Sequence, residues 1–400
     1  MNTGASRLTG RSVICIGTAD WETSLWTNQQ HLMSRLARDN RVVFTESLGL
    51  RRPTIAGRDL RRMLRRVSTG LRPPRSLDGV SVVAPLVLPF HGSPLVRRTN
   101  VVLLRALVRR AARRAALHRP ILWTYNPHAH ALVGSLGESL VVYHCVDDIA
   151  AQEGVDEASF TAAETALAPR ADLVIVSAPP LVEHMSRRGA RNVALLANVA
   201  DVAHFRAGME RPEPPPLAGV PRPRLIFAGA LAAKKLDLML LGELAKRRPE
   251  WSIVMVGPVG EGDPRGDLEA LRQAPNIHMM GAQRFSELPA WLGHADVGII
   301  PYAANQYTAS VFPMKVYEYL ASGLPVISTP LPSLSGVEGI TLADSAAAFE
   351  EAVARELRDD SESRRHERQL IAEAHSWERR LDEIGELVRQ AEAVAAGAAD

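Results

Sequence analysis

Short apolar segments alternate with stretches of helical spacing along almost the whole chain, and this alternation constrains the fold more than any other feature. It is typical of parallel α/β sheets, in which a helix follows each strand and crosses over to the next one. The predicted strands of the first half are 12–17, 41–46, 80–86, 121–125, 140–145, 172–177 and 193–198. Those of the second half are 224–229, 252–257, 276–281, 296–302, 325–329 and 339–343.

A proline-dense stretch divides the two sets of predicted strands. Residues 206–223, RAGMERPEPPPLAGVPRP, show no apolar periodicity, so we interpret them as an interdomain linker. We then expect a first domain of residues 1–205, a second domain of residues 224–375, and a C-terminal helix in residues 376–400 that packs back on the first domain. Ligands of open parallel sheets bind at the carboxyl ends of the strands, so the two domains are expected to face a cleft.

Composition limits the environment of the chain. Its 400 residues are 46% hydrophobic, which is enough to fill two domain cores. The N-terminal sequence MNTGASRLTGR lacks the apolar segment of a signal peptide, and no apolar run reaches the roughly 18 residues of a membrane-spanning helix. Cys15 and Cys145 lie in strand-like runs and are expected to be buried and reduced. We therefore expect a cytoplasmic protein, or one bound peripherally to the inner face of a membrane.

Positive charge is concentrated in the first domain. Between Ser47 and Pro120 the only acids are Asp59 and Asp78, whereas residues 50–67 and 97–119 are rich in arginine. Residues 97–119 have amphipathic helical spacing, so they are expected to lie on anionic lipid or an acidic acceptor, or else to form an ordinary solvated face. No aromatic residues alternate with the arginines and no nucleic-acid-binding motif is present, so no nucleic-acid partner is expected.

The second domain has a lysine at a place that a helix does not favour. In residues 310–329, SVFPMKVYEYLASGLPVIST, Pro313 suits a first helical turn and Gly323 suits a helix end. Lys315 falls in that first turn, where the helix dipole is already positive, which makes sense if the lysine and the dipole share a phosphate. Glu318 lies on nearly the same face, and its carboxylate suits the vicinal hydroxyls of a ribose. The alternative is a solvated Lys315, with Glu318 paired to it or capping locally.

A second anion site is predicted where the strand at 224–229 ends. Gly229 closes this strand, and Lys234 and Lys235 begin the following helix. The chain has only four lysines, at positions 234, 235, 246 and 315, and three of them fall at predicted helix starts. Two helix starts that carry lysine at one carboxyl edge suit a diphosphate, although a G-x-G-x-x-G fingerprint is absent.

Taken together, these segments resemble the GT-B-fold nucleotide-sugar glycosyltransferases, especially the large retaining family with a Glu-x7-Glu motif. FPMKVYEYLASGLPVIST resembles its donor-site helix, FAGALAAKKLDLMLLGELAKRRPEWSIVMVGP its diphosphate loop, NIHMMGAQRFSELPAWLGHADVGIIPY its nucleobase segment, and ANVADVAHF its hinge. The likeness covers about residues 190–385. In the first domain, DWETSLWTNQQHLMSRLA and VVYHCVDD are similar to bacterial polysaccharide and cell-envelope transferases of the teichuronic-acid type.

The resemblance implies a donor-binding role for a set of residues in the second domain. Glu318 would bind the ribose hydroxyls, while the diphosphate and nucleobase would be held by Gly229, Lys234, Lys235, Lys315, Gln283 and Arg284. The first glutamate of the family motif falls on Ser310, and a family arginine falls near Ala230, so two expected groups are missing. We expect Lys315 to make good the missing positive charge.

In the first domain the resemblance implies the acceptor site and the catalytic groups. His144, Asp147 and Asp148 follow a predicted strand, and His144 loosely matches the family histidine that contacts the donor sugar. Asp147 and Asp148 are candidates for a base or for binding sugar hydroxyls, or alternatively for a helix N-cap. Asp20 and Glu22 follow the first strand, where inverting relatives carry their base.

Two histidines after the strand at 121–125, His128 and His130, are interpreted as structural or as lining the acceptor. The spacings of histidine and cysteine match no zinc pattern, so no metal site is predicted.

The sequence therefore predicts an α/β protein of the GT-B fold with two Rossmann-like domains. The resemblance implies a metal-independent hexosyltransferase that moves a sugar from a nucleoside-diphosphate sugar to a cell-envelope, polysaccharide or natural-product acceptor, with retention. The nucleotide sugar is a substrate, and no cofactor is expected. The alternatives are an inverting transferase, a nucleotide-sugar epimerase, and a catalytically silent partner subunit.

Overall fold

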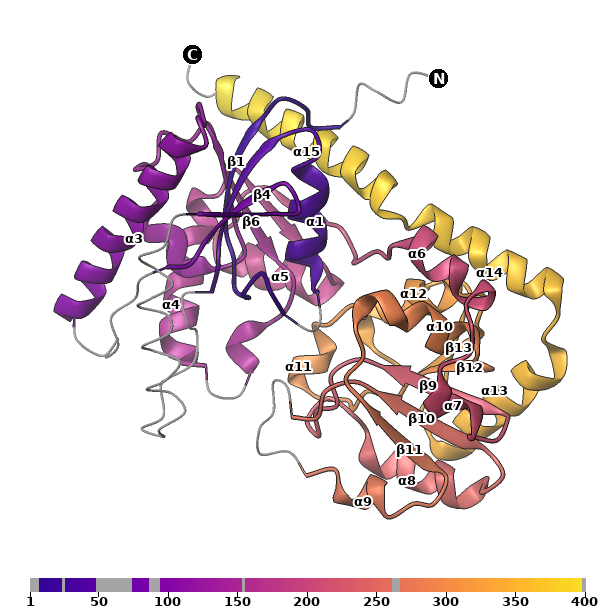
Figure 1. Cartoon of the computed structure of the whole chain (residues 1–400). Coiled ribbons are helices and arrows are strands. Elements are labelled where there is room, and N and C mark those ends of the chain that lie inside the picture. Colours follow the sequence, from indigo (N-terminus) through magenta and orange to yellow (C-terminus); the bar gives the residue numbers. More distant parts are fainter. Residues whose placement is uncertain are drawn as a thin grey trace. The chain divides into compact units, whose positions relative to one another are not determined.

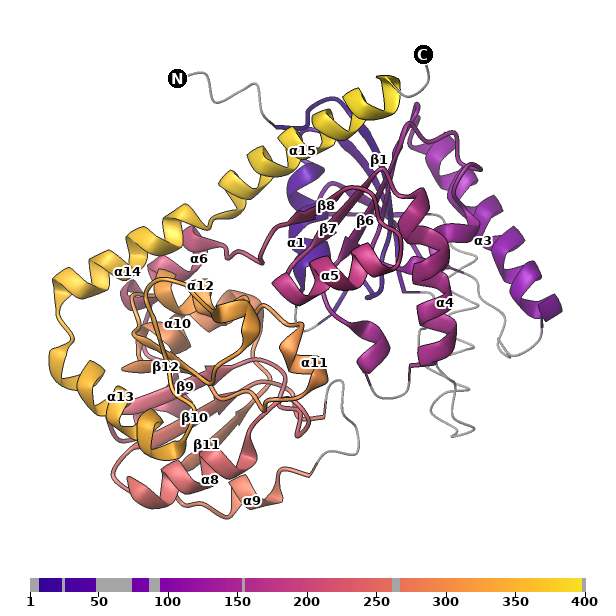
Figure 2. The same cartoon turned by 180° about the vertical axis from the view of Figure 1, so that it is seen from behind.

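Two compact units make up the computed structural model of the chain (Figures 1 and 2). One consists of residues 1–196 and 381–400, and the other of residues 197–380. The structure describes residues 7–23, 26–47, 74–85, 94–152, 155–260 and 267–397. The arginine-rich residues 50–67 lie outside this part of the chain.

The N-terminal unit is built on a sheet that has eight strands among the described residues. Their order is β3-β4-β2-β1-β5-β6-β7-β8, and all neighbours are parallel except β3 and β4. The strands are β1 (Ser12–Ile16), β2 (Arg41–Thr45), β3 (Arg75–Leu77), β4 (Val80–Val83), β5 (Ile121–Thr124), β6 (Leu140–Cys145), β7 (Leu173–Val176) and β8 (Val193–Leu195). The inner strands are buried along their length, as expected for a parallel sheet that is covered on both faces.

Helices cover this sheet through narrow apolar stripes. They are α1 (Asn28–Leu36), α3 (Pro94–Arg114), α4 (Glu157–Leu167), α5 (Pro179–Arg187) and the 3-10 turns η1 (Pro127–Ala131), η2 (Ile149–Ala151) and η3 (Ala168–Arg170). Leu104 and Val108 of α3 pack against Ile14 and Leu122, which places the amphipathic helix predicted at 97–119 on the sheet. The opposite face of α3 stays exposed.

The C-terminal unit has a parallel sheet of six strands within the described residues. The strands are β9 (Arg224–Ala228), β10 (Ser252–Val256), β11 (Ile277–Gly281), β12 (Val297–Ile300), β13 (Val326–Ser328) and β14 (Ile340–Leu342). Their order is β11-β10-β9-β12-β13-β14, which is the doubly wound arrangement of a Rossmann domain.

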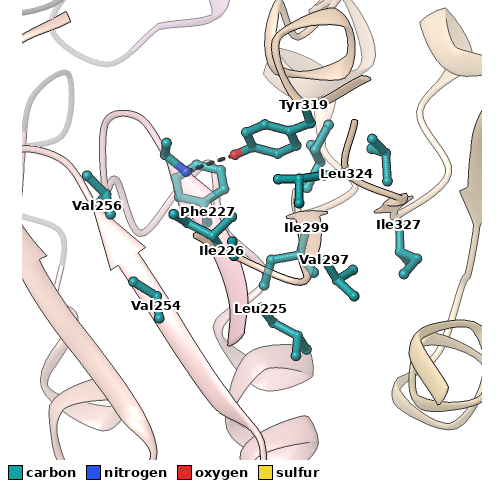
Figure 3. Close-up of a cluster of buried hydrophobic side chains, with 14 of the residues drawn as sticks. Leu225, Ile226, Phe227, Val254, Val256, Val297, Ile299, Tyr319, Leu324 and Ile327 are labelled. Carbon is teal, nitrogen blue, oxygen red and sulfur yellow. Dashed lines mark hydrogen bonds between the residues drawn. The ribbon is translucent and has the colours of Figure 1, made fainter. Parts of the chain in front are cut away.

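Helices on both faces of this second sheet complete its core. They are α6 (Val202–Arg206), α7 (Pro215–Ala218), α8 (Leu238–Arg247), α9 (Glu269–Arg272), α10 (Leu288–Gly293), α11 (Gln306–Ala309), α12 (Lys315–Ala321), α13 (Ala346–Asp359) and α14 (Glu362–Ala374), with the turns η4 (Ala207–Glu210), η5 (Phe285–Glu287) and η6 (Pro332–Leu334). Figure 3 shows the centre of the core, where Leu225 and Phe227 of β9 lie among Val254, Val297 and Ile327 of the neighbouring strands.

The last helix, α15 (Trp377–Gly397), begins in the C-terminal unit and ends in the N-terminal one. Arg7 pairs with Asp382 at 3.0 Å and Arg11 pairs with Glu392, so residues 381–397 are tied to the first strand region of the N-terminal unit. This matches the predicted helix at about 376–396 that packs back on the first domain.

The proline-rich residues 206–223 are packed on the C-terminal unit and contain η4 and α7. Leu217 and Val220 are buried in its core, and a Cβ on Gly208 would lie 2.2 Å from the Pro289 carbonyl oxygen. The boundary between the two compact units accordingly falls before this segment, between Leu196 and Ala197.

All thirteen predicted strands are present, and the described residues contain one further strand, β3, that was not predicted. β3 has only three residues and joins β4 through Asp78 and Gly79, whose φ angles of 51° and 79° are both positive. An Asp-Gly pair of this kind is typical of a tight hairpin turn, so the signal for β3 lay in the turn and not in apolar periodicity. Among the described helices, none is long and apolar enough to cross a bilayer.

Candidate functional site

Both sheets reverse their strand order at one point. In the C-terminal unit the reversal lies between β9 and β12, and in the N-terminal unit it lies between β1 and β5. The loops that follow such a strand pair diverge and leave a crevice at the carboxyl edge, which is where ligands of open parallel sheets bind. Most of the predicted site residues lie in or beside these loops.

In the C-terminal unit, backbone hydrogen bonds fix the loop after β9 against the loop after β12. The Ala303 N–H donates to the Lys235 carbonyl at 2.9 Å, and the Asp237 N–H donates to the Pro301 carbonyl at 2.8 Å. The Asn305 side-chain amide adds a bond to the Lys234 carbonyl at 2.8 Å. The backbone that carries both lysines is therefore held at the reversal point of the sheet.

Gly229, the first residue after β9, leaves room for a lysine from another element. Its φ angle is 150°, and a Cβ at this position would lie 2.4 Å from both Cε and Nζ of Lys315. Gly257, after the neighbouring strand β10, is tighter still, because its Cβ would lie 1.9 Å from the Gly229 carbonyl oxygen. Glycine at 229 thus allows the ammonium group of Lys315 to lie directly on the strand end.

Lys315 is the first residue of α12, as its predicted place in the first turn requires, although Pro313 lies just outside the helix. The ammonium nitrogen is 5.2 Å from the centre of the Phe227 ring. With the carboxylates of the described residues Lys315 makes no ion pair. Because α12 has only seven residues, its dipole is small, and the side chain itself is the main source of positive charge here.

Glu318 lies one turn further along α12 and is half-buried. Burial raises the pKa of its carboxyl group above the ordinary value of 4.5, and the positive charge of Lys315 offsets only part of the rise. Among the described residues, no group donates a hydrogen bond to this carboxylate or pairs with it at ion-pair distance. A partly desolvated carboxylate without a partner is costly for the folded chain, and such groups are typical of binding sites.

Lys235 brings a second ammonium group to the same place. Its nitrogen lies 4.8 Å from the centre of the Tyr302 ring, which follows β12. Burial alone would raise the pKa of the Tyr302 phenol, but Lys235 and Lys315 outweigh it and leave that pKa below its ordinary value. Tyr302 therefore lies within the influence of both cations, whereas the side chain of Lys234 is exposed.

The two residues predicted at the nucleobase, Gln283 and Arg284, follow β11. The amide of Gln283 donates to the Met280 carbonyl at 3.0 Å. The guanidinium of Arg284 is 81% exposed and pairs with Glu287. The structure thus brings together Gly229, Lys235, Lys315 and Glu318. It does not bring Gln283 and Arg284 to them, because these two residues follow β11, two strands away from β9, and bind Met280 and Glu287.

In the N-terminal unit, three of the four predicted catalytic residues follow strands, Asp20 after β1 and Asp147 and Asp148 after β6, whereas His144 lies within β6. Asp20 is exposed in the loop after β1, and its carbonyl accepts a hydrogen bond from Gln30 at 3.0 Å. Asp147 and Asp148 are half-buried after β6, and Asp148 occupies the N-cap position of η2 without a side-chain capping bond. His144, inside β6, is only 3% exposed and stacks on Tyr125 with ring centres 4.8 Å apart.

The histidines after β5 have local contacts. His128 packs edge-on against Phe160 with ring centres 6.1 Å apart, and a ring nitrogen of His130 lies 3.1 Å from the Pro127 carbonyl oxygen. Glu22, the other acid after β1, is exposed and pairs with Arg75.

Two residues near these loops, Tyr302 and Glu46, were not singled out from the sequence. Glu46 follows β2 and is 7% exposed; its carboxylate accepts the Trp21 N–H at 3.1 Å and pairs with Arg75 at 3.0 Å. Burial raises the pKa of this carboxyl group, and the Trp21 hydrogen bond and the Arg75 charge counteract it in part. Glu46 thereby fixes the loop that carries Asp20. The only indication of Glu46 in the sequence was that an acidic residue ends an apolar strand.

The arginines of α3 divide into two groups. The guanidinium groups of Arg105 and Arg109 donate to the carbonyls of Ala131 and Ser135, at 3.1 and 2.9 Å, and so hold the segment around η1. Arg98, Arg110, Arg113 and Arg114 are exposed. In the described part of the chain, no cluster of three histidine, cysteine or acidic side chains is arranged to hold a metal ion.

Two parallel-sheet domains in one chain, each with one reversal of strand order, define a class, the α/β proteins of the GT-B fold. Solved structures share this fold over nearly the whole chain. Sucrose-phosphate synthase (tll1590) from Thermosynechococcus elongatus is 18% identical with a TM-score of 0.67, covering 96% of this chain and 100% of that one. Anabaena Alr3699/HepE, solved with UDP and glucose, is 14% identical with a TM-score of 0.65, covering 95% and 100%.

Sequence comparison relates part of the chain to a family of proteins. Residues 222–359 match the family described as "Glycosyl transferases group 1". The chain is also 30% identical over 227 residues to the "Putative teichuronic acid biosynthesis glycosyltransferase TuaH" of Bacillus subtilis (strain 168), a match that covers 54% of this chain and 56% of that protein. The chain therefore has the GT-B fold, and its residues 222–359 are similar to the group 1 glycosyltransferases.

Proposed function

We propose that this protein transfers a sugar from a nucleoside-diphosphate sugar to a hydroxyl acceptor without a metal ion. The observation that carries the proposal is that Lys315, whose ammonium group lies on Gly229, is near the half-buried carboxylate of Glu318, which has no partner among the described residues. A diphosphate suits the first group and the vicinal hydroxyls of a ribose suit the second, and the two are one helical turn apart.

The two lysines are proposed to stabilise the leaving group. During transfer the bond between the anomeric carbon and the β-phosphate oxygen breaks, and its electron pair remains on that oxygen. The acceptor oxygen bonds to the anomeric carbon, and its proton passes to a base. In this proposal Lys235 and Lys315, which are both half-buried, supply positive charge where negative charge develops.

For the base, the candidates are the carboxylates at the carboxyl edge of the N-terminal sheet. Asp20, Asp147 and Asp148 are exposed or half-buried, so they are accessible to a substrate. His144 is buried against Tyr125, so we do not assign proton transfer to it. We propose retention at the anomeric carbon, as the resemblance to the Glu-x7-Glu family implies, and the anomeric signal of the product in NMR tests it.

The acceptor is proposed to be a cell-envelope polysaccharide precursor or a natural product. The support is the similarity to the Bacillus subtilis protein named for teichuronic acid biosynthesis. The exposed arginines of α3 suit an anionic acceptor or a membrane surface that carries one.

The test is a thermal-shift series with UDP-, GDP-, ADP- and dTDP-sugars, followed by an assay of nucleoside-diphosphate release with the sugar that binds. The expected result is stabilisation by one nucleotide class and its loss in Lys315→Ala. Lys246→Ala is the matched control, because Lys246 is exposed on α8 and makes no contact with the site. Stabilisation without product release on any acceptor would favour a silent partner subunit, and no stabilisation at all would refute the proposal.

A further inference from the structure

A large basic cavity lies at the edge of the N-terminal sheet that faces away from the predicted catalytic residues. Its volume is about 1010 Å³. The lining residues precede or begin β1, β2, β5 and β6 or lie on the last turns of α15, so the cavity is at the amino ends of these strands. All of it belongs to one compact unit, residues 1–196 with 381–400.

Positive groups predominate on the walls of this cavity. The lining residues include four arginines (Arg11, Arg38, Arg41 and Arg119) and His118, against two acidic residues, Asp39 and Glu392. Arg11 is engaged, because it binds Glu392 through both terminal nitrogens. The guanidinium groups of Arg38 and Arg119 make no ion pair or hydrogen bond with the described residues.

Hydrogen bonds hold the turn that carries His118 and Arg119 in a fixed position. The Arg41 guanidinium donates to the Ala116 carbonyl at 2.9 Å, and the His118 N–H donates to the Ser12 hydroxyl at 3.1 Å. The Ser139 hydroxyl donates to the Arg119 carbonyl at 2.9 Å. Arg119 has a φ angle of 41°, a conformation that an arginine adopts only when its surroundings impose it. The cavity wall is therefore preorganised.

We propose that this cavity binds a phosphate-bearing anion, which shares Arg11 with Glu392 or displaces that carboxylate. Guanidinium groups bind phosphate oxygens in pairs of parallel hydrogen bonds, and a polyanion compensates a wall on which arginines outnumber acids. The site is separate from the donor site, because it lies at the amino edge of the other sheet. Since Glu392 is on α15, which also contributes residues 377–380 to the C-terminal unit, the ligand competes with the helix that both units share.

Pyrophosphate is the probe, and the donor site is disabled so that it does not contribute. In full-length Lys235→Ala/Lys315→Ala protein, calorimetric titration is expected to show one pyrophosphate site that weakens as salt is added. Adding Arg38→Gln/Arg119→Gln is expected to weaken it about tenfold or more, because two charge-assisted contacts are lost. The control Arg187→Gln/Arg191→Gln removes the same charge from exposed positions elsewhere on this unit and should leave affinity within about twofold.

Removing a negative charge from the cavity wall separates a specific site from general attraction. Glu392→Gln removes the competing carboxylate, so pyrophosphate affinity should rise severalfold while the net charge rises by only one. The proposal is wrong if pyrophosphate fails to bind in the Lys235→Ala/Lys315→Ala background, or if Arg38→Gln/Arg119→Gln and its control behave alike. Neither outcome depends on whether the donor site binds nucleotide, so the two proposals fail independently.

The phosphate has two sources that the experiment distinguishes. Vesicles of phosphatidylglycerol, compared with phosphatidylcholine, test a lipid headgroup. The cavity binds a lipid headgroup if the protein sediments with the anionic vesicles, if pyrophosphate prevents this sedimentation, and if Arg38→Gln/Arg119→Gln abolishes it. Vesicle binding that survives this variant, with pyrophosphate binding still dependent on Arg38 and Arg119, assigns it to a soluble phosphate compound.

Discussion

The hydroxyl of Tyr319 accepts a hydrogen bond from the backbone N–H of Ala228 at 2.8 Å (Figure 3). Ala228 is the last residue of β9, at a point where β12 no longer pairs with it. The Tyr319 ring also packs on Gly298 of β12, where a Cβ would come within 2.4 Å of it. One side chain thus fixes α12 on both strands that flank the reversal point, and with it the positions of Lys315 and Glu318.

Replacing Tyr319 by phenylalanine should destabilise the fold and weaken nucleotide binding together. Tyr319→Phe keeps the ring but leaves the buried Ala228 N–H without an acceptor, at a cost of about 1–3 kcal/mol. Urea denaturation measures this loss. Tyr317→Phe is the control on the same helix, because the Tyr317 hydroxyl makes no hydrogen bond with a described residue. Equal stability of the two variants would show that the Tyr319 bond does not anchor the helix.

Glu318→Gln should affect stability and binding in opposite directions. Because the pKa of this carboxyl group is raised in the folded chain, ionising it costs stability as pH rises from 4.5 through the raised pKa. At pH 7 the neutral glutamine avoids this cost, so the melting temperature should rise, and the gain should shrink as pH falls toward 4.5. Thermal unfolding of both proteins over this pH range measures it.

The same substitution should weaken nucleotide binding about tenfold to a few hundredfold, since it removes charge-assisted bonds to the ribose. In the wild type, affinity should increase as pH rises through the raised pKa, because the ionised carboxylate is the binding form. Glu243→Gln, at an exposed position on α8, serves as the control. If Glu318→Gln binds nucleotide as tightly as the wild type does, Glu318 does not bind the ribose and α12 has only a structural role.

Gly229 and Lys315 should behave as one unit. Lys315→Ala is expected to weaken binding of a nucleoside diphosphate more than of a monophosphate. Gly229→Ala should do the same, because its Cβ would push the ammonium group away. In the double variant the second change should add little, which titration of all four proteins tests. Full additivity would mean that the two residues act separately. Gly257→Ala should instead lower stability, since its Cβ meets backbone atoms.

The sequence predicted the parallel α/β fold and the positions of the strands well. Buried parallel strands are continuous apolar runs, so they can be recognised from neighbouring residues in the sequence. The sequence was less informative about the candidate site, where contacts between distant segments determine which side chains lie together. Lys234 and Lys235 are adjacent in sequence, and only the bonds of the 229–237 loop to residues 301–305 bring Lys235 beside Tyr302. Tyr302 was not predicted as a site residue for the same reason. Its role depends on two cations from segments 67 and 13 residues away, which no local pattern indicates.

Among the N-terminal candidates, single substitutions should lower kcat more than donor affinity. Asp20→Asn, Asp147→Asn and Asp148→Asn remove charge from accessible side chains, so each should leave the fold intact. His144→Ala, in contrast, leaves a cavity beside Tyr125 and should also lower the melting temperature. Steady-state kinetics with saturating donor compares them. If the Asp147 and Asp148 variants keep full activity while Asp20→Asn does not, the base lies after β1.

The exposed arginines of α3 should contribute to binding an anionic surface. The two arginines that hold the η1 segment are unsuitable for testing this prediction. Arg105 and Arg109 bind backbone carbonyls, so their removal would disturb the fold. Arg110→Gln/Arg113→Gln/Arg114→Gln changes only exposed side chains and should reduce sedimentation with phosphatidylglycerol vesicles. The reduction should be largest at low salt, because surface attraction is screened over about 10 Å at 0.1 M. If the wild-type protein does not bind such vesicles, the prediction is wrong and the basic face of α3 is an ordinary solvated surface.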